Sequence, residues 1–171
     1  MRLAYVTSLE RGVTDRVLAE AANELMKRGL RPAGVVQTNI LRPQRFHCDM
    51  DLVLLPDGPT INITQDLGAN ARGCRLDPGA LEQAVAQVSA RLQGGEADVL
   101  ILNKFGKHEA EGRGFREPIA NALEAGLPVI LGVNGLNLDA FLEFSAGCAE
   151  RLDCTASALV GWVENELALA A

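Results

Sequence analysis

The sequence has few aromatic residues, no long hydrophobic run and no excess of basic side chains. Aromatics make up 4% of its 171 residues, so the core has to be built mainly from alanine, leucine and valine, which suits helices packed on a sheet. The formal net charge of −6 argues against a dedicated nucleic-acid binder, because neutralising phosphates requires a basic face. No stretch approaches the roughly 20 apolar residues that a bilayer-spanning helix needs, and we expect no membrane partner.

The sequence also lacks a signal peptide and closely spaced cysteines. The charged residues Glu10 and Arg11 follow a short apolar run at the N-terminus, so we expect a cytoplasmic protein. No C-x-x-C pair of the kind typical of zinc or redox sites occurs, and in a reducing cytosol we expect free thiols. The four cysteines are Cys48, Cys74, Cys148 and Cys154.

What the sequence does contain is an alternation of strand-like and helix-like segments. The apolar patterns predict strands at 2–7, 33–37, 98–102 and 128–133, and helices at 14–28, 77–92, 115–125, 138–144 and 156–168. Two short runs at 51–55 and 60–64 flank Pro56-Asp57-Gly58-Pro59 and predict an antiparallel hairpin. We therefore expect residues 1–171 to form a single α/β domain. It has a mostly parallel sheet flanked by helices, with a hairpin insertion and with the first strand near the strands at 98–103 and 128–133.

The first strand-to-helix turn has the layout of a phosphate-binding loop. A Walker A motif is written GxxxxGK[ST] and joins a strand to a helix. Gly12 and Thr14 match its sixth and eighth positions, while Thr7 replaces the first glycine and Val13 replaces the lysine. Backbone amides and a helix N-terminus bind anions without that lysine, so the candidate phosphate or anion contacts are the whole turn. These residues are Ser8, Leu9, Glu10, Arg11, Gly12, Val13 and Thr14. The alternative is a plain turn in which Thr14 caps the helix.

A second segment carries a family resemblance. In P-loop proteins a buried strand ends in an aspartate that helps to hold magnesium, and here Asn103 follows the apolar run at 98–102. The run from Asn103 to Glu109, followed by Gly114-Phe115-Arg116-Glu117, resembles the D-E-I-G-x-M-E and G-F-R-E-A motifs of the THEP-type P-loop nucleoside-triphosphatases. The segment from Gly73 to Asp77 resembles their arginine-bearing segment.

Over its whole length the chain is similar to an uncharacterised bacterial family related to these enzymes, whose members tend to be encoded beside molybdate-transport genes. The resemblance implies a P-loop-like fold and a molybdenum context. The departures fall on catalytic positions, with Val13 for lysine, Asn103 for aspartate and Lys104 for glutamate. Magnesium is therefore not the expected cofactor, and Thr14 and Asn103 are candidate ligands for it.

Lys104 permits a sharper hypothesis. Lys104 follows a predicted strand whose end lies beside the first turn, so its ammonium would supply the charge of the missing Walker lysine. The alternative is a lysine in a loop whose side chain is solvated. Arg75 is a further candidate anion contact. Other cations, at Arg72, Lys107, Arg113 and Arg116, also follow sheet elements, where ligands of open α/β sheets bind. Two weak metal-ligand groupings are His47-Cys48-Asp49 with Asp51, and His108 with Glu109.

Three functions remain open on these residues. The first is a nucleotide- or oxyanion-binding protein with a degenerate P-loop, an accessory or sensor factor in molybdenum metabolism. The second is an active nucleoside-triphosphatase in which Lys104 replaces the lysine, Thr14 holds magnesium and Glu109 activates water or binds the metal. The third is an interaction module that binds no ligand. The expected cofactor is a nucleotide or a tetrahedral oxyanion, the expected partner is a small anionic ligand, and a homo-oligomer is left open.

Overall fold

One mixed sheet of seven strands forms the centre of the molecule. The computed structural model describes residues 1–40, 49–65 and 76–170. The strands lie in the order β4 (Thr60–Asn62), β3 (Asp49–Leu54), β2 (Pro32–Ile40), β5 (Val99–Phe105), β6 (Val129–Val133), β1 (Leu3–Val6) and β7 (Glu150–Arg151). The neighbouring strands β2, β5, β6, β1 and β7 pair in parallel. The hairpin of β3 and β4 is antiparallel and extends the sheet beyond β2. The predicted α/β class, with its mostly parallel sheet, is confirmed.

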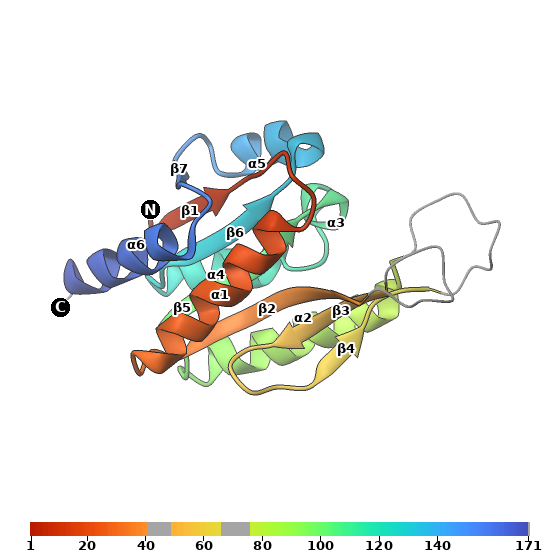
Figure 1. Cartoon of the computed structure of the whole chain (residues 1–171), viewed down its shortest axis with the longest axis horizontal. Coiled ribbons are helices and arrows are strands. Elements are labelled where there is room, and N and C mark those ends of the chain that lie inside the picture. The colour runs from red at the N-terminus through yellow and green to blue at the C-terminus, as the bar shows by residue number, and fades with distance from the viewer. Residues whose placement is uncertain (41–48, 66–75, 171) are drawn as a thin grey trace.

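Helices cover both faces of the sheet (Figure 1). One face carries α1 (Val13–Lys27) and α6 (Ala156–Ala168), and the other carries α2 (Pro78–Gln93), α4 (Arg116–Glu124) and α5 (Leu138–Phe144). The short helix α3 (Lys107–Ala110) and a 3₁₀ turn (Gly135–Asn137) follow β5 and β6. Both chain termini lie at one end of the molecule, and the strands of the parallel part point toward the opposite end.

The sequence explains why these elements form where they do. Helix α1 buries one stripe of apolar residues at helical spacing, among them Val17, Leu18 and Leu25, and Gly29 with φ of 82° follows its end. The Asp77 side chain accepts hydrogen bonds from the backbone amides of Gly79 and Ala80, which caps α2 as predicted. All five residues of β6 are buried, as expected for a strand covered on both faces.

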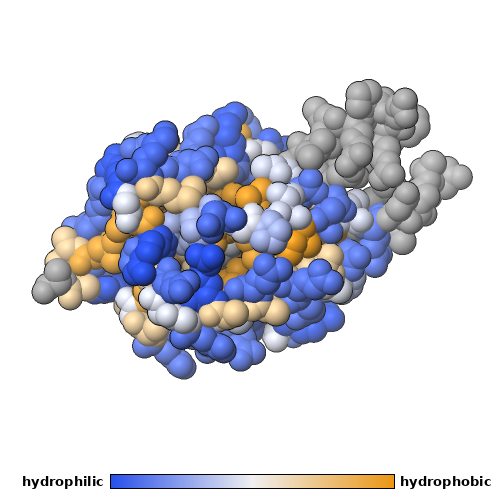
Figure 2. All heavy atoms as spheres, turned by 90° about the horizontal axis from the view of Figure 1, so that it is seen from below, coloured by the Kyte–Doolittle hydropathy of each residue, from blue (hydrophilic) through white to orange (hydrophobic). Residues whose placement is uncertain are grey.

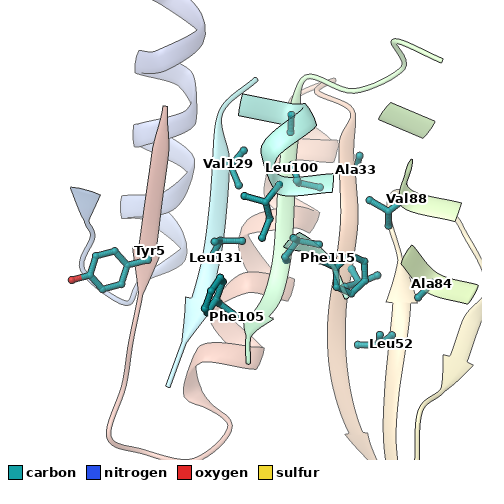
Figure 3. Packing of buried hydrophobic residues seen from close by; sticks show 14 of the residues in the cluster. Tyr5, Ala33, Leu52, Ala84, Val88, Leu100, Phe105, Phe115, Val129 and Leu131 are labelled. Atoms are coloured by element: carbon teal, nitrogen blue, oxygen red, sulfur yellow. The ribbon is translucent and has the colours of Figure 1, made fainter. Parts of the chain in front are cut away.

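Aromatic residues are few, and several of them gather in the core on the α2 face. The ring centroid of Phe141 lies 5.1 Å from that of Tyr5 and 5.3 Å from that of Phe105. Figure 3 shows Tyr5 at one side of this core, while Phe115 and Leu52 lie at the other. The face seen in Figure 2 is mostly hydrophilic, with hydrophobic residues between the polar ones. Among the described residues, no helix has the length and apolar content needed to cross a membrane.

Four details differ from the sequence prediction. Helix α1 begins at Val13 after Gly12, whose φ is 78°, so Thr14 is not its cap. The segment expected to be a loop from Lys104 contains the end of β5 and the helix α3. Strand β2 continues to Ile40 because its residues 35–40 pair with β3, and the two-residue strand β7 was not predicted.

Candidate functional site

The turn between β1 and α1 leaves the sheet at its carboxyl edge, at a point where the chain path reverses. From β1 the chain passes over β6 and β5 through α1 to reach β2, whereas from β6 it passes to β7 on the other side of β1. The neighbouring strands β1 and β6 therefore send their connections in opposite directions. Ligands of open α/β sheets bind beyond the strand ends at such a position.

Several backbone amides of this turn have no acceptor among the described residues. Within the described chain, the amides of Leu9, Arg11, Gly12 and Thr14 donate no hydrogen bond, and no side chain caps α1. Leu9 is fully exposed, and Arg11 and Gly12 are exposed. These donors, together with the positive end of a 15-residue helix, favour an anion.

Two other amides of the turn are satisfied internally. The Glu10 amide donates to the Ser8 hydroxyl at 3.1 Å, and the Val13 amide donates to the Glu10 carbonyl at 3.4 Å. The predicted contact set at residues 8–14 therefore divides into amides that are held inside the turn and amides that remain for a ligand.

A glycine in β6 lets the start of α1 lie directly on the sheet. A β-carbon at Gly132 would come within 2.2 Å of the Asn103 carbonyl oxygen, 2.9 Å of Thr14 Cγ2 and 3.0 Å of Leu18 Cδ1. The absence of a side chain at Gly132 thus sets how closely the first turn of α1 approaches β6. The sequence reading did not single out this position, although a glycine within an apolar strand run is a known signal of close approach.

Asn103 joins the first turn of α1 to β2. It is buried, and its amide nitrogen donates to Asp15 Oδ1 at 2.9 Å and to Gln37 Oε1 at 3.4 Å. Its Oδ1 accepts from the Gln37 backbone amide at 3.0 Å. The Asn103 side chain therefore links β5, α1 and β2. P-loop proteins have a carboxylate at the end of the corresponding strand, and here the Asp15 carboxylate of α1 lies beside that position.

The two candidate magnesium ligands do not fit that ion as they stand. The Asn103 oxygen is uncharged and already accepts a backbone hydrogen bond, whereas magnesium sites of this class use a carboxylate. The Thr14 side chain hydrogen bonds with Cys154, and this contact partly opposes the rise that burial causes in the Cys154 pKa. No group of three or more metal-ligating acids, histidines or cysteines occurs in the described ranges.

Glu109 is a structural acceptor in the segment between β5 and α4. Its side chain is 4% exposed; Oε2 accepts from the Gly106 amide at 2.9 Å, and Oε1 accepts from the Phe115 amide at 3.0 Å. The Arg116 guanidinium donates to the Glu109 carbonyl at 3.1 Å. Each carboxylate oxygen thus accepts one backbone hydrogen bond in a buried position, which indicates a structural role, and the predicted role of Glu109 in water activation or metal binding stays a prediction.

Lys104 lies near the end of β5, exposed, at the mouth of a cavity of about 240 Å³. None of residues 8–14 lines this cavity, which opens on the face covered by α2 and α4. Lys104 has no acid partner among the described residues. Lys104 therefore lines a cavity to which residues 8–14 do not contribute, whereas Asn103, which hydrogen bonds to Asp15 of α1, lines the same cavity.

The remaining predicted cations are scattered. Lys107 pairs with Glu111 at 3.6 Å, and Arg113 pairs with the same carboxylate, which lowers the pKa of Glu111. The Arg116 guanidinium lies 4.6 Å from the Phe144 ring centroid. Arg72, Arg75, His47 and Cys48 lie outside the described residues. In the described part, Asp51 accepts a hydrogen bond from Asn62 at 2.6 Å.

The sheet order and the strand-to-helix turn at its switch point define a P-loop-like α/β protein. The fold is similar to the solution structure of a human cancer-related nucleoside triphosphatase, with a TM-score of 0.62, 16% sequence identity and coverage of 99% of this chain and 97% of that one. At this identity the likeness concerns the fold alone.

The chain belongs to the family described as DUF2478, a family of proteins of unknown function, whose pattern matches residues 3–162. It is also 35% identical over 162 residues to the molybdenum import ATP-binding protein ModC 2 of Bradyrhizobium diazoefficiens. That alignment covers 94% of this chain and 18% of the relative, so the chain spans about a fifth of that protein's length. The family resemblance drawn from the sequence is confirmed.

Proposed function

We propose that the protein binds a nucleotide or another tetrahedral oxyanion at the β1–α1 turn. The observation that carries this proposal is a set of amides at the carboxyl edge of the parallel strands that have no acceptor in the described part of the chain, on Leu9, Arg11, Gly12 and Thr14. The fold likeness to a nucleoside triphosphatase and the similarity to an ATP-binding protein support it. Arg11 is the described side chain best placed by sequence to add a planar cation to the same turn.

We further propose that the chain acts as an accessory or sensor factor in molybdenum metabolism and not as an efficient hydrolase. The name of the similar ModC 2 protein supports the molybdenum context. Hydrolysis of a nucleoside triphosphate needs charges that neutralise the transferred phosphoryl group, and Val13 and Asn103 supply none. In place of the strand carboxylate, Asn103 holds the Asp15 carboxylate through its amide.

The binding step is tested by calorimetric titration with ATP, GTP, phosphate, molybdate, tungstate and sulfate, each with and without magnesium. We expect at least one of these anions to bind, and to bind without magnesium, because backbone amides carry the contact. A bound anion also stabilises the folded protein, by about 2.7 kcal/mol when the anion concentration is a hundredfold above Kd. The unfolding midpoint should therefore rise when that anion is added. No binding by any anion of this series would refute the proposal.

A matched pair of glycine variants separates binding from stability. Gly12 and Gly29 flank α1 with φ of 78° and 82°, and a β-carbon would meet nothing within 4 Å at either. Gly12→Ala and Gly29→Ala should therefore cost similar stability, on the order of 1–2 kcal/mol. Only Gly12→Ala should weaken anion binding. Equal affinities in the two variants would remove the turn from the site.

Variants at Val13 and Lys104 test whether a lysine side chain contributes positive charge to the bound anion. Val13→Lys restores the Walker ammonium and should strengthen binding of phosphate groups. If Lys104→Ala weakens the same binding tenfold or more, its ammonium reaches the anion; an unchanged affinity leaves the backbone amides as the contact. A phosphate-release assay giving about one turnover per second with magnesium would overturn the accessory role and favour a working hydrolase.

A further inference from the structure

The cavity beside Lys104 has an apolar interior that the β1–α1 turn does not share. Its wall includes Val35 from β2, Leu52 from β3 and Leu81 from α2, all buried. Phe115, ahead of α4, closes another side, and Figure 3 shows Phe115 and Leu52 in the same part of the core. These residues belong to the core cluster on the α2 face, whereas the buried residues of α1 belong to the opposite cluster.

The more exposed part of the cavity lining contains two lysines, a histidine and two asparagines. Lys104, Lys107 and His108 lie there, together with the Asn134 and Asn137 side chains that follow β6. The only acid in the described lining is Glu109, and each of its carboxylate oxygens accepts a hydrogen bond from a backbone amide. Lys107 pairs with Glu111, so Lys104 is the lining lysine without an acid partner among the described residues.

We propose that this cavity is a second ligand site, which takes a small organic carboxylate with a compact apolar body. The apolar part, a single aromatic ring or a short aliphatic chain, lies among Val35, Leu52, Leu81 and Phe115. The carboxylate lies at the mouth beside Lys104. The cavity is below the usual volume of sites for drug-sized ligands, which limits the body to about one ring. An inorganic oxyanion gains nothing from the apolar wall, so the two proposed sites select different chemistry.

Phenylacetate and its uncharged analogue 2-phenylethanol are the probes. In a ¹⁵N-labelled sample of the full chain, phenylacetate should give saturable amide shifts that are largest at the end of β5, in α3 and at Phe115. 2-Phenylethanol should cause shifts at the same amides with about tenfold weaker affinity, since it lacks the charge-assisted contact. Shifts that do not saturate, or that spread over the whole surface, would overturn the proposal.

Variants of the mouth and the interior separate the two parts of the site. Lys104→Met keeps the stem and removes the charge, so it should weaken phenylacetate binding about tenfold and leave 2-phenylethanol unchanged. Lys27→Met is the matched control, because Lys27 is an exposed lysine in the last turn of α1. Equal phenylacetate affinities in the two variants would contradict the assigned role of Lys104.

Filling the cavity tests the interior and keeps this site distinct from the anion site. Leu76 and Met50 line the cavity and are only half-buried, so Leu76→Trp or Met50→Trp adds volume without opening the core. In whichever variant keeps the wild-type spectrum elsewhere, both probes should lose binding while the oxyanion that binds wild type still binds. Retained phenylacetate binding would overturn this inference alone, and lost oxyanion binding would show that the two sites are one.

Discussion

Replacing Glu109 by glutamine is the sharpest test of whether this carboxylate is structural or catalytic. Glu109 is 4% exposed and accepts from the Gly106 amide at 2.9 Å and the Phe115 amide at 3.0 Å. It thereby ties the end of β5 to the start of α4. A glutamine keeps one carbonyl oxygen but turns an NH₂ group toward the second amide.

The expected cost follows from these two bonds. Glu109→Gln loses one charge-assisted hydrogen bond and leaves one buried N–H facing a donor, which together amount to about 2–3 kcal/mol. For a chain of this size, about 1 kcal/mol lowers the unfolding midpoint by roughly 2–4 °C, so the midpoint should fall by roughly 4–12 °C. Anion binding at the β1–α1 turn should remain, because Glu109 does not contact that turn.

Thermal and urea unfolding of wild type, Glu109→Gln and Glu111→Gln measure the effect. Glu111 is the matched control, since it lies two residues away and its partners Lys107 and Arg113 are exposed. Its variant should unfold almost as wild type does. If Glu109→Gln keeps the wild-type midpoint but lowers phosphate release, the structural role is refuted and water activation by Glu109 is supported.

Three further predictions address packing, pH and thiol chemistry. Gly132→Ala should lower the free energy of unfolding in urea by about 1–3 kcal/mol, because a β-carbon there meets a backbone carbonyl. Gly135→Ala is the control and should have almost no effect, since a β-carbon there meets nothing within 4 Å. Equal effects of the two substitutions would contradict the close approach of α1. Hydrogen bonds from an arginine lower the pKa of Asp98, so its stabilising effect is present above about pH 4 and is lost as pH falls through the lowered pKa. Asp98→Asn should therefore lower the midpoint at pH 7 and match wild type in acid, and a difference that persists in acid would argue against the ion pair. Burial raises the pKa of the Cys154 thiol, so at pH 8 iodoacetamide should label Cys154 more slowly than the exposed Cys148, as mass spectrometry would show; equal rates would contradict this.

The sequence predicted the elements whose own residues determine them. Helices α5 and α6 occur at the predicted residues, because periodic apolar positions and capping residues fix a helix locally. The continuous apolar runs of β5 and β6 predicted buried parallel strands for the same reason. The two-residue strand β7 has no pattern of its own and exists only through pairing with β1.

The candidate site was less predictable because its contacts join distant segments. The hydrogen bond from Asn103 to Asp15 spans 88 residues and depends on α1 crossing β5, which no local pattern indicates. The cap made by Glu109 did have a signal, since Gly106 and Glu109 have the spacing of a capping box. Lys104 lies in the irregular part of the pairing between β5 and β6 after Leu102, an irregularity that the spacing does not indicate. Spacing alone therefore did not indicate that Lys104 lines a cavity to which residues 8–14 do not contribute.

The shortness of β4 and β7 bears on how this protein meets other proteins. They are the outermost strands of the sheet and contain three and two residues. An edge strand recruits a further strand through its row of unpaired backbone groups, and so few residues present almost no such row. Growth of the sheet into a neighbouring chain is thus disfavoured at both ends of the described fold. If copies of the chain associate, we expect contacts between helix faces or side chains, and an assembly of that kind can be dissociated by surface substitutions that leave the sheet intact.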